Sequence, residues 1–236
     1  MKKAFSFLLI FVLALSLFLI PVSGVNHTFT DVTPDAWYSE GVSYVWEKGL
    51  MVGVSSQHFA PEKSVTRAMM VTILWRLAGS PEIDYEDLMY QNEYWLLSDI
   101  PENAYYETAA LWAKANGIME GYAVPYDPQD PPTGLEVYEF RPDGILTREQ
   151  LATVLYRYAN QAGMVPQGSP ALDFAFPDKD SVSSWAEDAM DWCVSAGLIR
   201  GTTYHGTTLL YPKGSTTRAQ LATILLRFEN LCPTDK

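Results

Sequence analysis

The sequence predicts an all-α protein built from three helix-loop-helix repeats, and two observations carry this prediction. A Thr-Arg pair occurs three times, and each copy begins an apolar stretch in which a second arginine follows nine residues later. Upstream of each copy, an aromatic residue precedes two glycines by 12 and by 16 residues. A frame that recurs at fixed spacing is typical of repeat proteins, whose units bury their apolar faces against one another. The frame consists of Trp37, Gly49, Gly53, Arg67 and Arg76, then Tyr105, Gly117, Gly121, Arg148 and Arg157, then Trp185, Gly197, Gly201, Arg218 and Arg227.

The start of the chain has the features of an export signal. A basic beginning is followed by an apolar run of 17 residues that ends at Pro21. Small residues at Val22 and Gly24 fit the positions that signal peptidase reads. We therefore expect residues 1–24 to be a signal peptide that is cleaved before Val25, which leaves a secreted protein without a membrane segment. An uncleaved membrane anchor is the alternative, although the apolar run is at the lower limit for crossing a bilayer.

Charge and composition exclude several function classes. The formal net charge is −12, and removal of residues 1–24 takes away two lysines and no acidic residue, which makes it −14. Such an acidic protein is a poor partner for nucleic acid or anionic lipid. The three histidines lack ligand spacing, so neither a metal site nor a cofactor is expected. Cys193 and Cys232 leave two interpretations open, a disulfide formed after export or a buried Cys193 beside a free tail thiol.

The first helix of each repeat is expected to follow the aromatic landmark. Apolar positions recur with the helical period through residues 105–116 and 185–196, and the same pattern follows Trp37. A helix end favours a residue that tolerates positive φ. The glycines expected in that position are Gly49, Gly117 and Gly197.

A connection with a shared proline joins the two helices of each repeat. The proline precedes the motif arginine by six residues in every copy. Insertions at residues 82–94 and 122–139 are acidic, and the second lacks the glycine and the spacing of an EF-hand calcium loop, so solvated loops are expected. We expect no strands beyond short pairings in the connections near Phe59, Phe140 and Leu210.

The second helix of each repeat begins with a threonine cap. The hydroxyl of such a residue accepts a hydrogen bond from a backbone amide of the first turn. A glutamine three residues later completes a capping box in repeats two and three, whereas repeat one has Met69 there. The caps and their partners are Thr66 with Met69, Thr147 with Gln150, and Thr217 with Gln220.

The order of these landmarks resembles the S-layer homology (SLH) domain. The opening of that family is complete in Phe29-Thr30-Asp31-Val32 and degraded in Ser98-Asp99-Ile100 and Phe176-Pro177-Asp178. The family's usual glutamate two residues after the motif arginine is replaced in all three copies. The resemblance implies a pseudo-threefold bundle with grooves between neighbouring repeats. The repeats cover residues 29–79, 96–163 (with the insertion 122–139) and 174–231.

The resemblance also implies non-covalent binding of secondary cell-wall polysaccharide, commonly through a pyruvate ketal, which holds exported proteins on the cell wall. Each motif arginine stands at a helix N-terminus, where unpaired amides and the macrodipole favour an anion, and a guanidinium can hold a carboxylate by two parallel bonds. The aromatic landmarks offer a ring to a sugar, and the second glycines allow close approach to the backbone. The candidate ligand-binding residues are Arg67, Arg148, Arg218, Trp37, Tyr105, Trp185, Gly53, Gly121 and Gly201, together with Asp31, Asp99 and Asp178.

A structural role for the motif arginines stays open at this point. They could form ion pairs with the aspartates of a neighbouring repeat, namely Asp31, Asp99 and Asp178. The later arginines complement the negative end of the helix dipole and are expected to be structural. These are Arg76, Arg157 and Arg227.

Competing function classes differ in what they require of the chain. The repeats use the whole mature sequence and leave no catalytic domain, so we expect a protein that is not an enzyme. A cell-surface adaptor that binds other envelope proteins through residues 82–94 and 122–139 is the first alternative. A cell-wall hydrolase is the second, and it would need paired carboxylates in a fixed arrangement.

Overall fold

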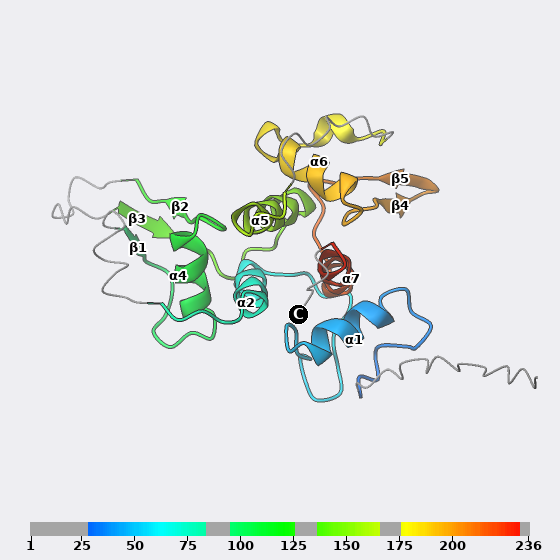
Figure 1. Ribbon diagram of the computed structural model, residues 1–236, viewed down its shortest axis with the longest axis horizontal. Coiled ribbons are helices and arrows are strands. Elements are labelled where there is room, and N and C mark those ends of the chain that lie inside the picture. Colours follow the sequence, from blue (N-terminus) through cyan, green and yellow to red (C-terminus); the bar gives the residue numbers. More distant parts are fainter. Residues whose placement is uncertain (1–27, 84–94, 126–135, 166–175, 232–236) are drawn as a thin grey trace, which may run out of the picture.

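The computed structural model describes residues 28–83, 95–125, 136–165 and 176–231, which are mainly helical (Figure 1). The predicted signal peptide and Cys232 lie outside these residues. Among these residues each repeat contributes two α-helices, and short 3-10 turns η1 (Lys179–Ser181) and η2 (Ser184–Ala186) precede the last pair. The helices are α1 (Ser39–Glu47) and α2 (Arg67–Leu77), α4 (Glu107–Ala115) and α5 (Arg148–Gln161), and α6 (Glu187–Ser195) and α7 (Arg218–Glu229).

The first helices begin two residues after their aromatic landmark and end two residues before the predicted glycine. Gly49, Gly117 and Gly197 have φ values of 67°, 60° and 70°, which confirms the predicted helix ends. A side chain other than glycine is strained in this left-handed region. The aromatic landmark itself therefore lies just outside the helix, where its ring is exposed.

The second helices begin at the motif arginine, as predicted. The hydroxyls of Thr66, Thr147 and Thr217 each accept a hydrogen bond of 3.3 Å from the backbone amide three residues later. Complete capping boxes are present with Gln150 and Gln220. The predicted start of each of these helices is thus confirmed.

The strands are more numerous than the sequence predicted. In repeat two, β3 (Glu136–Glu139) pairs antiparallel with β2 (Tyr122–Ala123) and parallel with β1 (Trp95–Leu97). In repeat three, β4 (Thr202–Tyr204) pairs antiparallel with β5 (Thr207–Leu209). Pairing near Phe140 and Leu210 was expected, but β1 was not. It is an apolar segment just after the acidic insertion, and Leu97 is buried there.

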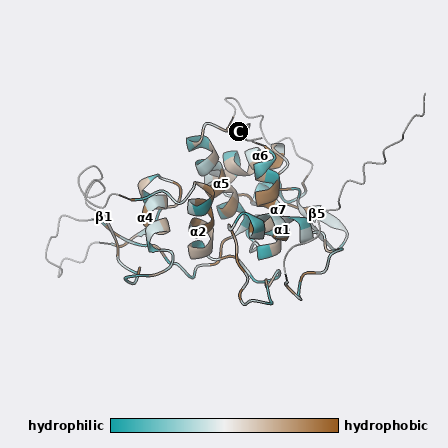
Figure 2. Ribbon diagram, turned by 60° about the horizontal axis from the view of Figure 1, so that its bottom comes forward, coloured by the Kyte–Doolittle hydropathy of each residue, from teal (hydrophilic) through white to brown (hydrophobic). Residues whose placement is uncertain are grey.

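Helices of different repeats pack in a cyclic order. The first helix of each repeat lies against the second helix of another repeat: α4 on α2, α6 on α5, and α1 on α7. In Figure 1 the second helices lie in the middle and the first helices outside them. Figure 2 shows that each helix carries both hydrophobic and hydrophilic residues, as expected when one face is buried.

Backbone hydrogen bonds close the same cycle at the centre. Val65 N donates to Thr216 O at 2.9 Å, Thr216 N donates to Leu146 O at 3.1 Å, and Leu146 N donates to Val65 O at 3.0 Å. All three residues are fully buried. The last repeat is therefore joined directly to the first.

The first amide of each second helix is also bound by another repeat. The backbone N–H of Arg67 donates to Gly144 O, that of Arg148 to Gly214 O, and that of Arg218 to Lys63 O, each at 2.9 Å. A helix leaves its first amides without partners inside the helix. Here a neighbouring connection supplies those partners, so the helix N-terminus is filled by protein.

The remaining sequence expectations concern cysteine and membrane segments. Cys193 is a free, fully buried thiol whose Sγ lies 3.8 Å from Ala152 O, and burial raises its pKa well above the usual value. Within the described residues no helix has the length and apolar character needed to span a bilayer.

Candidate functional site

The motif arginines are buried and reach across to another repeat. Arg67, Arg148 and Arg218 are only 7%, 4% and 6% exposed. Their Nε atoms donate to the carbonyl oxygens of Phe140 at 2.6 Å, Leu210 at 2.7 Å and Phe59 at 2.8 Å, respectively. Each arginine therefore holds the connection of a second repeat in place.

The aspartates hold the same connections from within their own repeat. Asp31 accepts the backbone amides of Phe59 and Ala60 at 2.9 and 2.8 Å. Asp99 and Asp178 accept the equivalent pairs of amides. The second residue of each pair has positive φ, between 52° and 58°. Burial raises the pKa of Asp31, but the amide bonds outweigh this and hold the pKa below its usual value.

These contacts correct the ion-pair alternative for the motif arginines. Within the described residues, none of the three lies within 4.0 Å of a carboxylate oxygen. Burial lowers the pKa of Arg218, and the charge of Asp31 opposes this effect at longer range. The aspartates are already used by backbone amides, which is why they do not pair directly with the guanidinium groups.

The three guanidinium groups differ in their remaining contacts. Nη2 of Arg67 donates to Glu120 O, and Nη2 of Arg218 donates to Val52 O, both at 2.6 Å. Arg200 stands at the position equivalent to Glu120 and Val52, but no hydrogen bond joins its carbonyl to Arg148 in the described chain. In the described parts of the chain, the terminal nitrogens of Arg148 make no hydrogen bond. Arg148 thus keeps donors for another partner.

Aromatic rings cover the other two guanidinium groups to different degrees. Arg218 lies 4.4 Å from the centroid of the Phe59 ring. Arg67 lies 5.0 Å from the Phe140 ring and 5.1 Å from the Tyr122 ring. The Tyr122 ring also contacts the guanidinium of Arg141 at 4.2 Å, so it lies between two arginines.

The second glycines of the frame are needed by the protein's own packing. A Cβ on Gly53 would lie 2.6 Å from the Phe29 ring, and one on Gly201 would lie 2.8 Å from the Phe176 ring. A Cβ on Gly121 would lie 2.8 Å from Cβ of Tyr138. The close approach inferred from these glycines is therefore made by residues of the same repeat.

The aromatic landmarks remain open to solvent. Trp37, Tyr105 and Trp185 are 64%, 67% and 57% exposed. Trp37 packs edge-on against Tyr38, and Tyr105 packs in the same way against Tyr106. An indole or phenol ring supported in this way leaves a flat apolar face available to a ligand.

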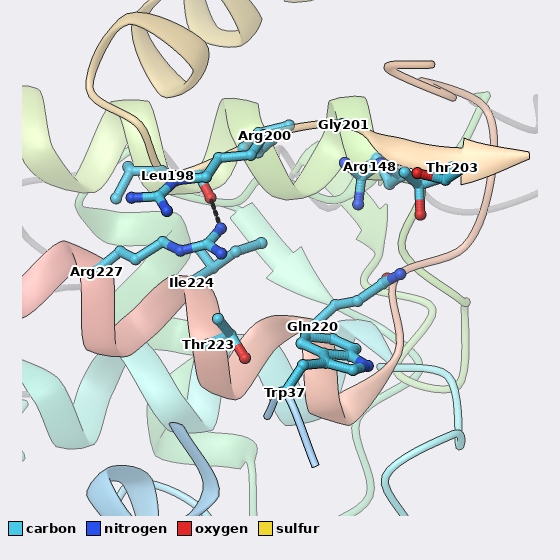
Figure 3. Close-up of a pocket in the computed structure, with 12 residues that line it drawn as sticks. Trp37, Arg148, Leu198, Arg200, Gly201, Thr203, Gln220, Thr223, Ile224 and Arg227 are labelled. Atoms are coloured by element: carbon cyan, nitrogen blue, oxygen red, sulfur yellow. Dashed lines mark hydrogen bonds between the residues drawn. The ribbon is translucent and has the colours of Figure 1, made fainter. Parts of the chain in front are cut away.

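One cavity of about 230 Å³ brings predicted residues of all three repeats together (Figure 3). Trp37 comes from repeat one, Arg148 from repeat two and Gly201 from repeat three. Figure 3 shows Arg148, Thr203 and Gln220 extending toward the same space, with Trp37 at its edge. We call this cavity the Arg148 pocket. Its other lining residues are Leu198, Ile199, Arg200, Thr202, Thr223, Ile224 and Arg227.

The Arg148 pocket is cationic in an acidic chain. Its lining, which lies wholly within the described residues, has three arginines and no aspartate or glutamate. Burial lowers the pKa of Arg227, and the positive charge of Arg200 lowers it further. Arg227 Nη1 donates to Leu198 O at 2.9 Å, which supports the structural role expected for this residue. A bound anion would relieve the repulsion between these cations.

Sequence reasoning missed Arg200 and the polar residues beside it. A signal for Arg200 was present, because it stands directly before the second glycine of the frame, where the other repeats have Val52 and Glu120. Thr203 and Gln220 carry no comparable signal, since threonine and glutamine are common at turns and caps. In the described chain, no group of three or more His, Cys, Asp or Glu side chains could hold a metal ion.

Comparison with known proteins gives relatives of several kinds. The chain is 27% identical to a surface-layer 125 kDa protein of Lysinibacillus sphaericus, over 84% of this chain and 14% of that protein. It is 27% identical to a cellulosome-anchoring protein of Acetivibrio thermocellus, over 72% of this chain and 33% of that protein. It is 26% identical to an endoglucanase of Bacillus sp. (strain KSM-635), over 95% of this chain and 22% of that protein.

The chain thus spans at most 33% of the length of each of these relatives. A family model for the S-layer homology domain matches residues 28–69, 97–152 and 175–222, which together make up more than half of the chain. The repeated frame, the cyclic packing and these three matches agree, and the chain belongs to the S-layer homology domain family.

Proposed function

We propose that this chain anchors an exported protein to the bacterial cell wall by non-covalent binding of secondary cell-wall polysaccharide. The names of a surface-layer relative and of a cellulosome-anchoring relative support a location at the cell surface. An endoglucanase is also related, but the match covers only 22% of that enzyme, so the likeness supports a shared attachment module rather than shared catalysis.

The observation that carries the proposal is the chemistry of the Arg148 pocket. A buried guanidinium with free terminal donors, an exposed tryptophan ring and neutral polar side chains line one cavity. Arginine binds a carboxylate by two parallel bonds, and an indole face packs against the apolar face of a sugar. We infer that the ligand is a sugar that carries a carboxylate, such as a pyruvate ketal.

The arrangement of the repeats is part of the same proposal. We infer a pseudo-threefold bundle of repeats at 29–79, 96–163 and 174–231, which follows a signal peptide at residues 1–24. The closed ring of backbone bonds through Val65, Leu146 and Thr216 supports the bundle. Because the Arg148 pocket draws on all three repeats, only the assembled triplet would bind.

A binding experiment with matched polymers tests the proposal. Purified protein from residue 25 onward is titrated with cell-wall polymer that carries the ketal and with the same polymer after mild acid removes the ketal. We expect binding to the first and a much weaker signal with the second. Equal binding to both would exclude carboxylate recognition, and absence of binding to both would exclude wall attachment. Release of reducing sugar during the assay would instead indicate a hydrolase.

A further inference from the structure

We propose that this chain binds the acidic polymer at a single groove, the Arg148 pocket, and that Arg200 makes this groove selective for an anionic sugar. The inference rests on the proposed function, because it assigns that binding to one place. It is based on a comparison of the surroundings of Arg67, Arg148 and Arg218, which occupy the same position in the three repeats. Two features distinguish the Arg148 pocket from the surroundings of both Arg67 and Arg218, and a third distinguishes it from those of Arg67.

The first difference is the number of free donors on the motif arginine. Arg67 and Arg218 each donate from Nε and from Nη2 to two carbonyl oxygens of a neighbouring repeat. Within the described residues the side chain of Arg148 donates to Leu210 O alone, although Arg148 is just as buried. A guanidinium has five N–H donors, and the terminal nitrogens of Arg148 are not among the fully buried unpaired atoms of the described residues, so they can be reached from the pocket that Arg148 lines. An anion in the pocket would supply partners for Arg148.

The second difference is the residue before the second glycine of the frame. Repeat one has Val52 and repeat two has Glu120, whereas repeat three has Arg200. Nε of Arg200 donates to Gly197 O at 3.1 Å, and Figure 3 shows the side chain at the Leu198 end of the pocket, near Arg227 and across from Arg148. An aliphatic side chain at this position adds no attraction for an anion, and a carboxylate repels it.

The third difference is the residue after the same glycine. Repeat three has Thr202 there, which lines the Arg148 pocket. Repeat two has Tyr122, whose ring lies between the guanidinium groups of Arg67 and Arg141. The guanidinium of Arg67 thus already contacts an aromatic ring of the protein, which takes the place of a ligand there.

The size and the neutral lining of the pocket define the class of ligand. A volume of about 230 Å³ is below the roughly 300–1,000 Å³ of drug-sized sites. It suits one substituted sugar of a polymer rather than a longer segment. Thr203, Gln220 and Thr223 are neutral and can bond to sugar hydroxyls, while the arginines take the carboxylate.

Titration calorimetry of the protein from residue 25 onward, with a purified wall fragment that carries one ketal, tests the inference. We expect one fragment per chain. Arg200→Val copies the residue of repeat one and should weaken binding about tenfold to a hundredfold, the loss expected for one charge-assisted contact. It should also reduce the preference for ketal over ketal-free fragment. Glu120→Val is the matched control at the equivalent position and should leave the affinity unchanged.

The exposed aromatic landmarks provide a second set of variants whose folding is not at risk. Trp37→Ala should lose binding, whereas Tyr105→Ala and Trp185→Ala should bind like the parent, with all three melting as the parent does. Two or three fragments per chain, full affinity of Arg200→Val, or equal losses in the three aromatic variants would overturn the single-groove inference. Those outcomes leave wall binding itself intact. Failure of the parent protein to bind any wall fragment would instead overturn the proposed function.

Discussion

At the scale of single residues, the motif arginines share a sequence position but differ in what they hold. Arg67 and Arg218 each bind two carbonyl oxygens in another repeat, and Arg148 binds one. A hydrogen bond that involves a charged group contributes about 1.5–3 kcal/mol. Arg67 and Arg218 are therefore cross-links of the fold, whereas Arg148 has donors left for a ligand.

We predict that Arg67→Ala and Arg218→Ala each reduce the free energy of unfolding by about 3–6 kcal/mol, and Arg148→Ala by about half as much. Urea unfolding followed by circular dichroism measures these differences. Arg67→Lys should recover only part of the loss, because a single ammonium cannot bridge two carbonyls as the guanidinium does. Equal losses in the three alanine variants would contradict the contacts assigned to Arg148.

A substitution at Thr216, unlike those of the arginines, is expected to raise the free energy of unfolding. The backbone of Thr216 belongs to the central ring, yet its hydroxyl oxygen is buried and has no hydrogen-bond partner among the described residues. The equivalent residues are the aliphatic Val65 and Leu146. We predict that Thr216→Val raises the free energy of unfolding by about 1 kcal/mol, because an unpaired buried hydroxyl is removed without a change of shape. A lower urea midpoint in this variant would show that the hydroxyl has a partner in solution.

At the scale of elements, each connection depends on one aspartate. Asp31 accepts two amides of a turn in which Ala60 has a φ of 58°. Its native pKa is below the usual 3.8, so the native state binds fewer protons there than the unfolded state. This stabilisation is fully present above about pH 4 and is lost as the pH falls through the native pKa.

We predict that Asp31→Asn reduces the free energy of unfolding by about 1–3 kcal/mol at pH 7, because one of the two amides loses its acceptor. The difference from the parent should shrink as the pH falls below 3.8, where the parent loses the same interaction. Urea titrations at neutral and acidic pH measure both effects. Asp35→Asn changes an exposed carboxylate nearby and should stay within about 0.5 kcal/mol of the parent. A deficit for Asp31→Asn that does not vary with pH would contradict the linkage.

The elements were largely predictable because their signals are local. Thr66, Thr147 and Thr217 mark helix starts through hydrogen bonds that span three residues, and a glycine marks each first-helix end. Strand β1 was not predictable in this way, because it pairs with β3 some 40 residues later in the chain. Likewise, the aspartates could be assigned to amides only once the fold brought the connections back onto them.

Several residues of the candidate site were predictable from local signals, but their arrangement around one cavity was not. Trp37, Arg148 and Gly201 were all identified from the frame, but nothing local indicates that they line one cavity, since each belongs to a different repeat. The free donors of Arg148 follow from the missing bond to the carbonyl of Arg200, which is a property of the assembled chain. The repeat predicts which residue types recur in all three copies. The positions at which the copies differ, such as Val52, Glu120 and Arg200, distinguish one groove from another.

At the scale of the whole molecule, the repeats depend on one another to close a ring. Helix α1 packs on α7, and Val65 donates to Thr216, so the first repeat is completed by the last. Removing one repeat leaves an exposed apolar helix face and unpaired backbone groups at the centre. Stability should therefore not divide among the repeats as it does in an open array, where each unit contacts only its neighbours in sequence.

We predict that a chain of residues 25–165, which lacks repeat three, does not unfold cooperatively and has less helix per residue than the chain from residue 25 onward. Circular dichroism and urea titration measure this, since the shortened chain keeps α1, α2, α4 and α5 but loses the partner of α1 and one member of the central ring. It should also fail to bind wall polymer, even when repeat three is added as a separate chain, because the Arg148 pocket needs Trp37, Arg148 and Arg200 at once. A shortened chain that keeps a sharp transition and full helix content would show that the ring contributes little, and the repeats would then have to be treated as independent units.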